Sequence, residues 1–413
     1  MKRFGITDSF YSILITLLCG TPVSGHSQRL SYRPPLEKVL VILGQDMGAT
    51  GGFAYPDNDG YLDHFDQVPA GFTTYTSINR LEGLTEKTNY GSGNVCAQCY
   101  LDNEKYNNSV VVLGLYMVNQ LAEITNGSLD ANIKKLGTWI SAANRPVFVR
   151  IGYEFNASWA GYKPSDYIAA FRYLTDYWEE MGVLNFNTVW QSDGYGSSAQ
   201  LLAWYPGDNY VDWMAYSHFD GKGEGIIALA KTRSKPVMIA EATPRMDLKT
   251  TDGATAIQGW FEPFFNTIQQ NKGVIQAFCY INTNWEAQSM WKGGGWGDSR
   301  IQVNPEVQEF WINELLMDHY QFASSQLFET LSPFGTHHKE LAQASFKLVK
   351  KGAFYLLKSD DDEPAFFVLY TTTGQKILEG KWPANTLFDF HLIDMQRYLL
   401  KLNVKSDQMI IKL

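Results

Sequence analysis

The chain has 413 residues, of which 45% are hydrophobic and 19% are charged. This balance is that of a globular protein and excludes a chain that is mainly disordered. The 43 acidic residues outnumber the 34 basic ones, and the net charge of −9 leaves no basic excess for nucleic acid or an anionic membrane surface. Aromatic residues reach 14%, which fits either flat faces that stack on uncharged rings or a large β-rich core.

The N-terminal residues have the pattern of a secretory signal peptide. Lys2 and Arg3 precede a short apolar run from Tyr11 to Gly20, and small residues suited to cleavage follow at Ser24–Ser27. The apolar run is shorter than the roughly 20 residues that a membrane-spanning helix needs. We therefore expect a signal peptide over residues 1–27, no membrane span, and a protein that is secreted or held at the cell surface.

The cysteines beyond the predicted signal peptide indicate one disulfide and one buried thiol. Cys96 and Cys99 lie in a Gly- and Asn-rich loop, where a local disulfide is favoured over a redox motif or a zinc site, because structural zinc needs four ligands. Cys279 lies within an apolar run. The acidic loop Asp57–Asp66 lacks the spacing of the twelve-residue calcium loop, which favours a solvated turn. We expect no metal and no cofactor.

Residues 36–318 alternate apolar runs with amphipathic segments. The eight runs begin at Lys38, Gly71, Ser109, Pro146, Phe186, Val211, Lys235 and Ile275. One intervening segment, Pro164 to Met181, has apolar residues about one helical turn apart and predicts a helix. Near-continuous apolar runs are typical of parallel strands buried on both faces. Because Gly48–Gly52 lacks the spacing of a phosphate loop, we expect an α/β fold of the (β/α)8 TIM-barrel type rather than a doubly wound sheet.

Carboxylates follow two of the predicted strands, at the edge where such barrels carry their chemistry. Glu154 follows the fourth run and Glu241 ends the seventh. Glycoside hydrolysis requires such a pair, one to protonate the leaving oxygen and one to attack or stabilise the sugar. The alternative interpretation is structural, with Glu154 paired to Arg150 in the mouth of the barrel.

Two motifs surround these glutamates: Arg-x-x-x-Glu-x-Asn-x-x-Trp at Arg150–Trp159 and Pro-Val-x-Ile-Ala-Glu at Pro236–Glu241. They resemble glycoside hydrolase family 26 and its relatives in clan A, which are retaining endo-acting hydrolases of β-mannans and related β-glycans. The resemblance implies that Glu154 is the acid/base, with a pKa raised by burial and by Glu241, and that Glu241 is the nucleophile. It further implies substrate contacts for Asn156, Trp159 and Trp285.

Two positions depart from the family pattern. The residue before the acid/base is Tyr153 where the family has His, and Phe219 stands where a sixth-strand Tyr is expected to bond the nucleophile. The resemblance therefore leaves open a β-mannan or a related plant or algal glycan. The other residues expected around the substrate and the nucleophile are Arg150, Tyr153, Trp190, Tyr216 and His218.

The C-terminal part predicts a linker at residues 319–340 and an antiparallel β-sandwich at 341–413, because short alternating runs are bounded there by turn residues. Leu369-Tyr370 with Gly374-Gln375-Lys376, then Tyr398-Leu-Leu-Lys401, resemble the sorting domain of the type IX secretion system. That resemblance implies a secretion machinery as partner. A generic β accessory module is the alternative.

These observations predict a secreted, monomeric, retaining endo-β-glycosidase that acts on a polysaccharide. A non-catalytic glycan-binding protein on the same barrel is the alternative, and the presence of both Glu154 and Glu241 favours the enzyme.

Overall fold

The computed structural model describes residues 31–331 and, beyond them, the strands between residues 346 and 412. The predicted signal peptide, residues 1–27, lies outside the described residues. None of the described helices is long and apolar enough to cross a membrane.

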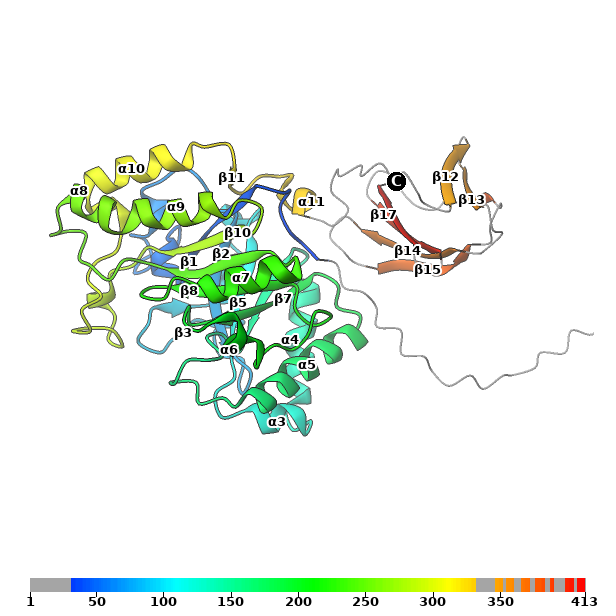
Figure 1. Ribbon diagram of the computed structural model, residues 1–413, viewed down its shortest axis with the longest axis horizontal. Coiled ribbons are helices and arrows are strands. Elements are labelled where there is room, and N and C mark those ends of the chain that lie inside the picture. Colours follow the sequence, from blue (N-terminus) through cyan, green and yellow to red (C-terminus); the bar gives the residue numbers. More distant parts are fainter. Residues whose placement is uncertain are drawn as a thin grey trace, which may run out of the picture.

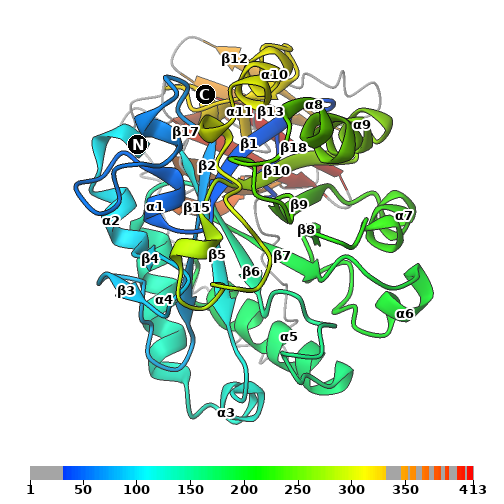
Figure 2. The ribbon, with the colours of Figure 1, turned by 90° about the vertical axis from the view of Figure 1, so that its left-hand side faces the viewer.

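Eight parallel strands close into a barrel (Figure 2). Strand β10 pairs with β1, with Leu40 opposite Ala277, and this pairing closes the sheet. Each of the eight predicted runs contains one strand, so the (β/α)8 barrel is confirmed. The strands are β1 (Val39–Gly44), β2 (Gly71–Ser77), β5 (Val110–Tyr116), β6 (Val147–Ile151), β7 (Phe186–Ser192), β8 (Trp213–His218), β9 (Val237–Ala242) and β10 (Ile275–Ile281).

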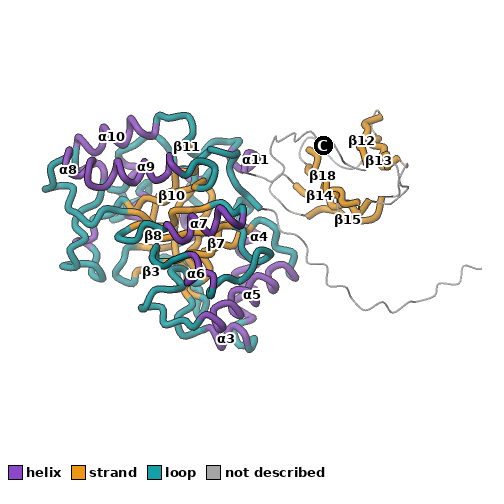
Figure 3. Tube along the Cα trace, in the orientation of Figure 1, coloured by secondary structure: helices purple, strands orange, loops and turns teal. Residues whose placement is uncertain are grey.

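The helices lie outside the strands (Figure 3). The predicted helix is α5, which begins at Pro164 and buries Tyr167, Leu174 and Trp178 on one face. Helices α9 and α10 run side by side on one side of the barrel (Figure 1). The α-helices of the barrel are α1 (Met47–Thr50), α2 (Ala97–Leu101), α3 (Leu121–Thr125), α4 (Asp130–Ala142), α5 (Pro164–Glu180), α6 (Ser198–Leu202), α7 (Glu224–Arg233), α8 (Gly253–Ala256), α9 (Glu262–Gln270) and α10 (Pro305–Leu315). A π-helical turn, η3 (Ile257–Phe261), joins α8 to α9, and the 3-10 turns are η1 (Tyr61–Asp63), η2 (Glu104–Tyr106), η4 (Trp285–Ala287) and η5 (Ile301–Val303).

A plug of buried side chains closes the amino-terminal end of the barrel. Trp213 Nε1 donates to the carbonyl of Tyr32 over 2.9 Å. Leu327 and Leu331, on α11 (Leu327–Leu331), are buried against the same cluster. Strand β11 (Tyr320–Gln321) pairs with β1. Residues 320–331, which the sequence suggested as the start of a linker, therefore pack on the barrel.

The cysteines lie as expected. Cys96 and Cys99 form a disulfide at the start of α2, directly after the short hairpin of β3 (Thr88–Asn89) and β4 (Asn94–Val95). Cys279 is a buried free thiol on β10.

The C-terminal strands form two small antiparallel sheets, in agreement with the predicted fold class. One has the order β12-β13-β16 and the other β15-β14-β17-β18. Phe367 and Trp382 are buried in the second sheet, with ring centres 6.5 Å apart. The strands are β12 (Phe346–Lys351), β13 (Phe354–Ser359), β14 (Ala365–Thr371), β15 (Lys376–Trp382), β16 (Leu387–Asp389), β17 (Tyr398–Val404) and β18 (Asp407–Lys412).

Candidate active site

A cavity of about 890 Å³ opens at the carboxyl ends of the barrel strands. Glu154 and Glu241, the two glutamates singled out from the sequence, both line it. Tyr153, Trp159 and Trp285 line it as well. Because barrels of this kind carry their chemistry at this edge, the cavity is the candidate active site.

The carboxylate of Glu241, on β9, is bound by side chains from four other strands. Arg150 on β6 places Nη1 3.2 Å from Oε1, and the hydroxyl of Tyr75 on β2 donates to the same oxygen. The other oxygen accepts from Gln191 Nε2 on β7 over 2.9 Å and from Ser217 Oγ on β8 over 3.1 Å. This network fixes the carboxylate in one orientation.

Arg150 is the charge partner of Glu241. Arg150 is fully buried and Glu241 is 5% exposed, so each charge offsets the other where water cannot. The structural alternative from the sequence, an ion pair between Arg150 and Glu154, is not the one formed.

Tyr75, like Gln191 and Ser217, is a residue of the site that the sequence did not single out. Tyr75 lies in the run that begins at Gly71, and no motif there distinguishes it from its neighbours. Burial raises its pKa well above the usual value of 10, so the phenol keeps its proton and donates to Glu241. The tyrosine hydrogen bond expected from the sixth strand thus comes from the second. Phe219 lines the cavity and packs against Trp296, with ring centres 5.1 Å apart.

Glu154 lies in a tight turn directly after β6. Its φ of 52° is in the left-handed region, which residues with a Cβ seldom adopt, so the backbone is strained here. Trp159 Nε1 donates to Glu154 Oε2 over 2.8 Å. Burial and the negative charge of Glu241 raise the pKa of Glu154 to about 7, against the opposing hydrogen bonds from Ser217 and Trp159. The carboxyl group therefore carries its proton over much of the pH range below neutrality.

Ser217 connects the two carboxyl groups. Its hydroxyl bonds Glu241 over 3.1 Å and is also close enough to Glu154 to lower the pKa of that group.

Aromatic rings border Glu154. Trp159 is 47% exposed and lies nearly parallel to Tyr116, with ring centres 6.3 Å apart and 9° between the planes. Tyr153 contacts both Trp159, at 5.8 Å, and Tyr75, at 5.3 Å. These rings form an aromatic cluster beside the carboxyl group, in which only Tyr116 and Trp159 are nearly parallel.

A second aromatic group lies in the loop after β10. Trp285 is buried, and its Nε1 donates to Ser299 Oγ over 3.0 Å. Its ring centre is 5.0 Å from Trp296 and 5.5 Å from Trp291, and all three rings line the cavity.

This loop is joined to the β3–β4 hairpin across the rim of the cavity. The N–H of Met290 donates to the carbonyl of Gly91 over 2.9 Å. A separate bond, from Gln288 Nε2 to Asp46 Oδ2 over 3.2 Å, ties the same loop to the start of α1. Tyr90 and Met290 line the cavity at this junction, so the two loops form one wall.

Three residues expected around the substrate face away from the cavity. Trp190 is fully buried and stacks on Phe155 at 4.5 Å. Tyr216 and His218 point toward the helical layer, where His218 contacts Phe264 at 5.3 Å. Burial, aided by Lys222, lowers the pKa of His218 to about 4. The substrate contacts expected of these three residues are withdrawn on this geometry.

Asn156 has a supporting position. Its Oδ1 accepts from the N–H of Asp193 over 3.0 Å, and its Nδ2 donates back to the Asp193 carboxylate. It fastens the loop after β7 beside Glu154 rather than lining the cavity.

The acidic loop after α1 is held by protein donors. Asp57 is bound by Lys87 and Asn94, and Asp63 accepts from the N–H groups of Gly52 and Gly60. Within residues 31–331 and the described C-terminal strands, no cluster of three or more His, Cys, Asp and Glu side chains is placed to hold a metal ion.

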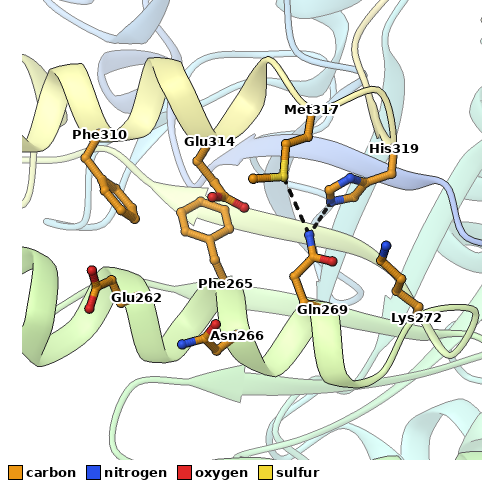
Figure 4. A pocket seen from close by; sticks show the side chains of 9 residues that line it. All are labelled: Glu262, Phe265, Asn266, Gln269, Lys272, Phe310, Glu314, Met317 and His319. Carbon is orange, nitrogen blue, oxygen red and sulfur yellow. Dashed lines mark hydrogen bonds between the residues drawn. The ribbon is translucent and has the colours of Figure 1, made fainter.

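A second cavity of about 590 Å³ lies between α9 and α10, on the outside of the barrel (Figure 4). Gln269 bridges to His319 over 2.8 Å and to the sulfur of Met317 over 3.9 Å. Neither Glu154 nor Glu241 lines this cavity.

Comparison with known proteins identifies the family to which the chain belongs. No protein-family model matches the chain. β-1,3-xylanase TXYA of a Vibrio species is 32% identical over 329 residues, which cover 72% of this chain and 69% of the relative. A β-1,3-xylanase of an Alcaligenes species is 31% identical over 329 residues, which cover 72% of this chain and 67% of the relative. The chain belongs to the β-1,3-xylanase family.

The fold of this family member is also that of GH26 enzymes. The structure of a GH26 β-mannanase from Bacteroides ovatus aligns with a TM-score of 0.54 at 13% identity, over 73% of this chain and 95% of that one. The protein is therefore a glycoside hydrolase of the endo-β-glycosidase kind on a GH26-like barrel, and the non-catalytic alternative is not retained.

Proposed function

We propose that this β-1,3-xylanase family member is a retaining endo-hydrolase of β-1,3-xylan, with Glu154 as acid/base and Glu241 as nucleophile. The observation that carries the proposal is the contrast between the two carboxyl groups. Burial and Glu241 raise the pKa of Glu154 to about 7, whereas Glu241 faces Arg150, Tyr75, Gln191 and Ser217, all as donors. Carboxyl groups with opposed environments are the mark of an acid and a nucleophile.

In the first step, Glu154 gives its proton to the glycosidic oxygen as Glu241 attacks the anomeric carbon. A glycosyl-enzyme forms and the leaving sugar departs. The indole of Trp159, 2.8 Å from Glu154 Oε2, holds the carboxyl group in place through the transfer. In the second step, ionised Glu154 takes a proton from water, which displaces Glu241 with net retention.

The substrate is inferred from the relatives. Both relatives are β-1,3-xylanases, which selects β-1,3-xylan from the β-mannan-type and related glycans that the motif resemblance left open. The departures at Tyr153 and Phe219 agree with a substrate other than mannan, because both residues line the cavity.

Export belongs to the same proposal. A signal peptide at residues 1–27 carries the chain across the inner membrane, and the C-terminal strands serve as a type IX sorting domain. Their antiparallel sheets agree with such a module. Deleting residues 341–413 is the direct test in a bacterium that has this machinery, with enzyme activity measured in cells and medium.

A panel of polysaccharides tests the activity. Signal-free protein should release oligosaccharides from β-1,3-xylan and at most traces from mannan, glucomannan and mixed-linkage glucan. The Glu241→Ala variant, assayed beside it, excludes a contaminating hydrolase. Preferential release from mannan would contradict the proposed substrate but not the proposed residues.

Tyr75→Phe removes one donor from Glu241. We expect kcat to fall about 10- to 100-fold, the effect of one hydrogen bond to a charged group, with KM changed little. An unchanged kcat would contradict the role assigned to the Tyr75 hydroxyl.

A further inference from the structure

The cavity has a polar side that the catalytic pair does not use. The residues that line it there lie at the end of β2, in the loop after it and in the segment after β5: Ser77, Asn79, Arg80, Glu82 and Gln120. Glu82 is the carboxylate among them, and its side chain is 28% exposed.

Glu82 is held in a fixed position. The hydroxyl of Ser77, at the end of β2, donates to its Oε2. Tyr90 lines the same cavity, and burial together with the Glu82 carboxylate raises the pKa of its phenol. Arg80 Nε lies 3.7 Å from Oε1, beyond hydrogen-bond distance but near enough for attraction between the charges.

The carboxylate keeps free acceptor capacity. A carboxylate offers about four lone-pair sites, and Ser77 and Tyr90 occupy two of them at most. A preorganised acceptor inside a cavity is suited to a hydroxyl group of a neutral ligand, because the protein has already met the cost of ordering the acceptor.

The spacing along β2 places Glu82 away from the reaction centre. Tyr75 bonds Glu241, and Ser77, two residues farther along the same face of the strand, bonds Glu82. Two residues of a strand span about 6.6 Å, comparable to one pyranose unit. In register with Ser77 on the neighbouring strand is Tyr116, which stacks with Trp159 beside Glu154.

We propose that Glu82 is a substrate-binding residue of the subsite next to the sugar under attack, where it accepts a hydrogen bond from a hydroxyl of a xylose unit. The proposal rests on the proposed function. It makes Glu82 a determinant of how the enzyme discriminates chain length, since a disaccharide that spans the cleaved bond does not occupy this subsite.

The test compares the wild type with Glu82→Gln on β-1,3-linked xylo-oligosaccharides of two to six units. Glutamine keeps the size of the side chain and loses the charged acceptor. We expect kcat/KM to fall about 10-fold on the longest substrates and by a progressively smaller factor as the chain shortens. Glu86→Gln, an exposed position on the same loop outside the cavity, is the matched control and should behave as wild type.

Two outcomes would overturn the proposal: kcat/KM of Glu82→Gln equal to wild type at every length, or lowered by the same factor at every length with a reduced Tm. Calorimetric binding of the hexasaccharide separates this proposal from the proposed function. If wild type binds the hexasaccharide about 10-fold more tightly than Glu82→Gln but cleaves no oligosaccharide, the subsite stands and the proposed function falls.

Discussion

Replacing Glu241 with alanine lowers kcat/KM on β-1,3-xylan by at least about 10,000-fold, because no other group can form the glycosyl-enzyme. The expected loss is as large for an aryl xylobioside with an activated leaving group as for the polymer, since nucleophilic attack is needed for both. Oligosaccharide release measures the loss on the polymer, and aryl-alcohol release measures the loss on the aryl xylobioside. Glu224→Ala, at the exposed start of α7, is the matched control.

The same substitution affects stability. It leaves Arg150 fully buried without its charge partner, at a cost of about 3–5 kcal/mol in the free energy of unfolding. Glu241→Asp separates folding from chemistry, because it keeps the negative charge near Arg150 but withdraws the attacking oxygen by one methylene. We expect this variant to be folded, by Tm, and nearly inactive.

Azide can take the place of the nucleophile that the Glu241→Ala variant has lost. Added to Glu241→Ala with the activated substrate, it enters the space of the lost carboxylate and gives the α-glycosyl azide, with inverted configuration. Recovery of the β-azide instead would contradict the assignment of Glu241.

The barrel could be predicted from sequence because its signal is local. A parallel strand buried on both faces is an unbroken apolar run, and each run from Lys38 to Ile275 stands out against the amphipathic segments between them. Glu154 and Glu241 were found because each lies at the end of such a run, where barrels carry their chemistry, and within a motif that resembles family 26.

The rest of the site could not be predicted because it depends on which way each side chain faces. In a strand buried on both sides, one residue points into the barrel and the next toward the helices. Ser217 faces inward to Glu241, so Tyr216 and His218 face outward. An apolar run does not show which of its residues face into the barrel. The sequence therefore pointed to the aromatic and titratable residues rather than to the serine.

Tyr75 and Glu82 were missed for a second reason. Tyr75 acts on Glu241, which is far away in the sequence, and only closure of the barrel brings β2 near β9. Glu82 lies in the irregular loop after β2. The contact of Tyr75 with Glu241 spans 166 positions. Such a pairing is a product of topology and has no local signature.

Glu154→Ala lowers kcat/KM on β-1,3-xylan about 100- to 10,000-fold, the usual contribution of a general acid. The effect should depend on the leaving group, which distinguishes it from Glu241→Ala. With a dinitrophenyl xylobioside, the first step needs no acid, so the variant should release a rapid burst of dinitrophenol and then stall at the glycosyl-enzyme. Azide should restore turnover and give the β-glycosyl azide. Equal losses on activated and unactivated substrates would contradict the assignment.

The pH profile gives an independent measure of the same residue. Burial and Glu241 raise the pKa of Glu154 to about 7, and the first step needs the protonated form. The wild-type kcat/KM should therefore fall as pH rises above about 7, about tenfold per pH unit. Glu154→Ala should lose this alkaline limb in its residual activity on β-1,3-xylan, while Glu180→Ala, at the exposed end of α5, should keep it. An alkaline limb that persists in Glu154→Ala would assign the titration to another group, and Glu154 would then serve only to position Trp159.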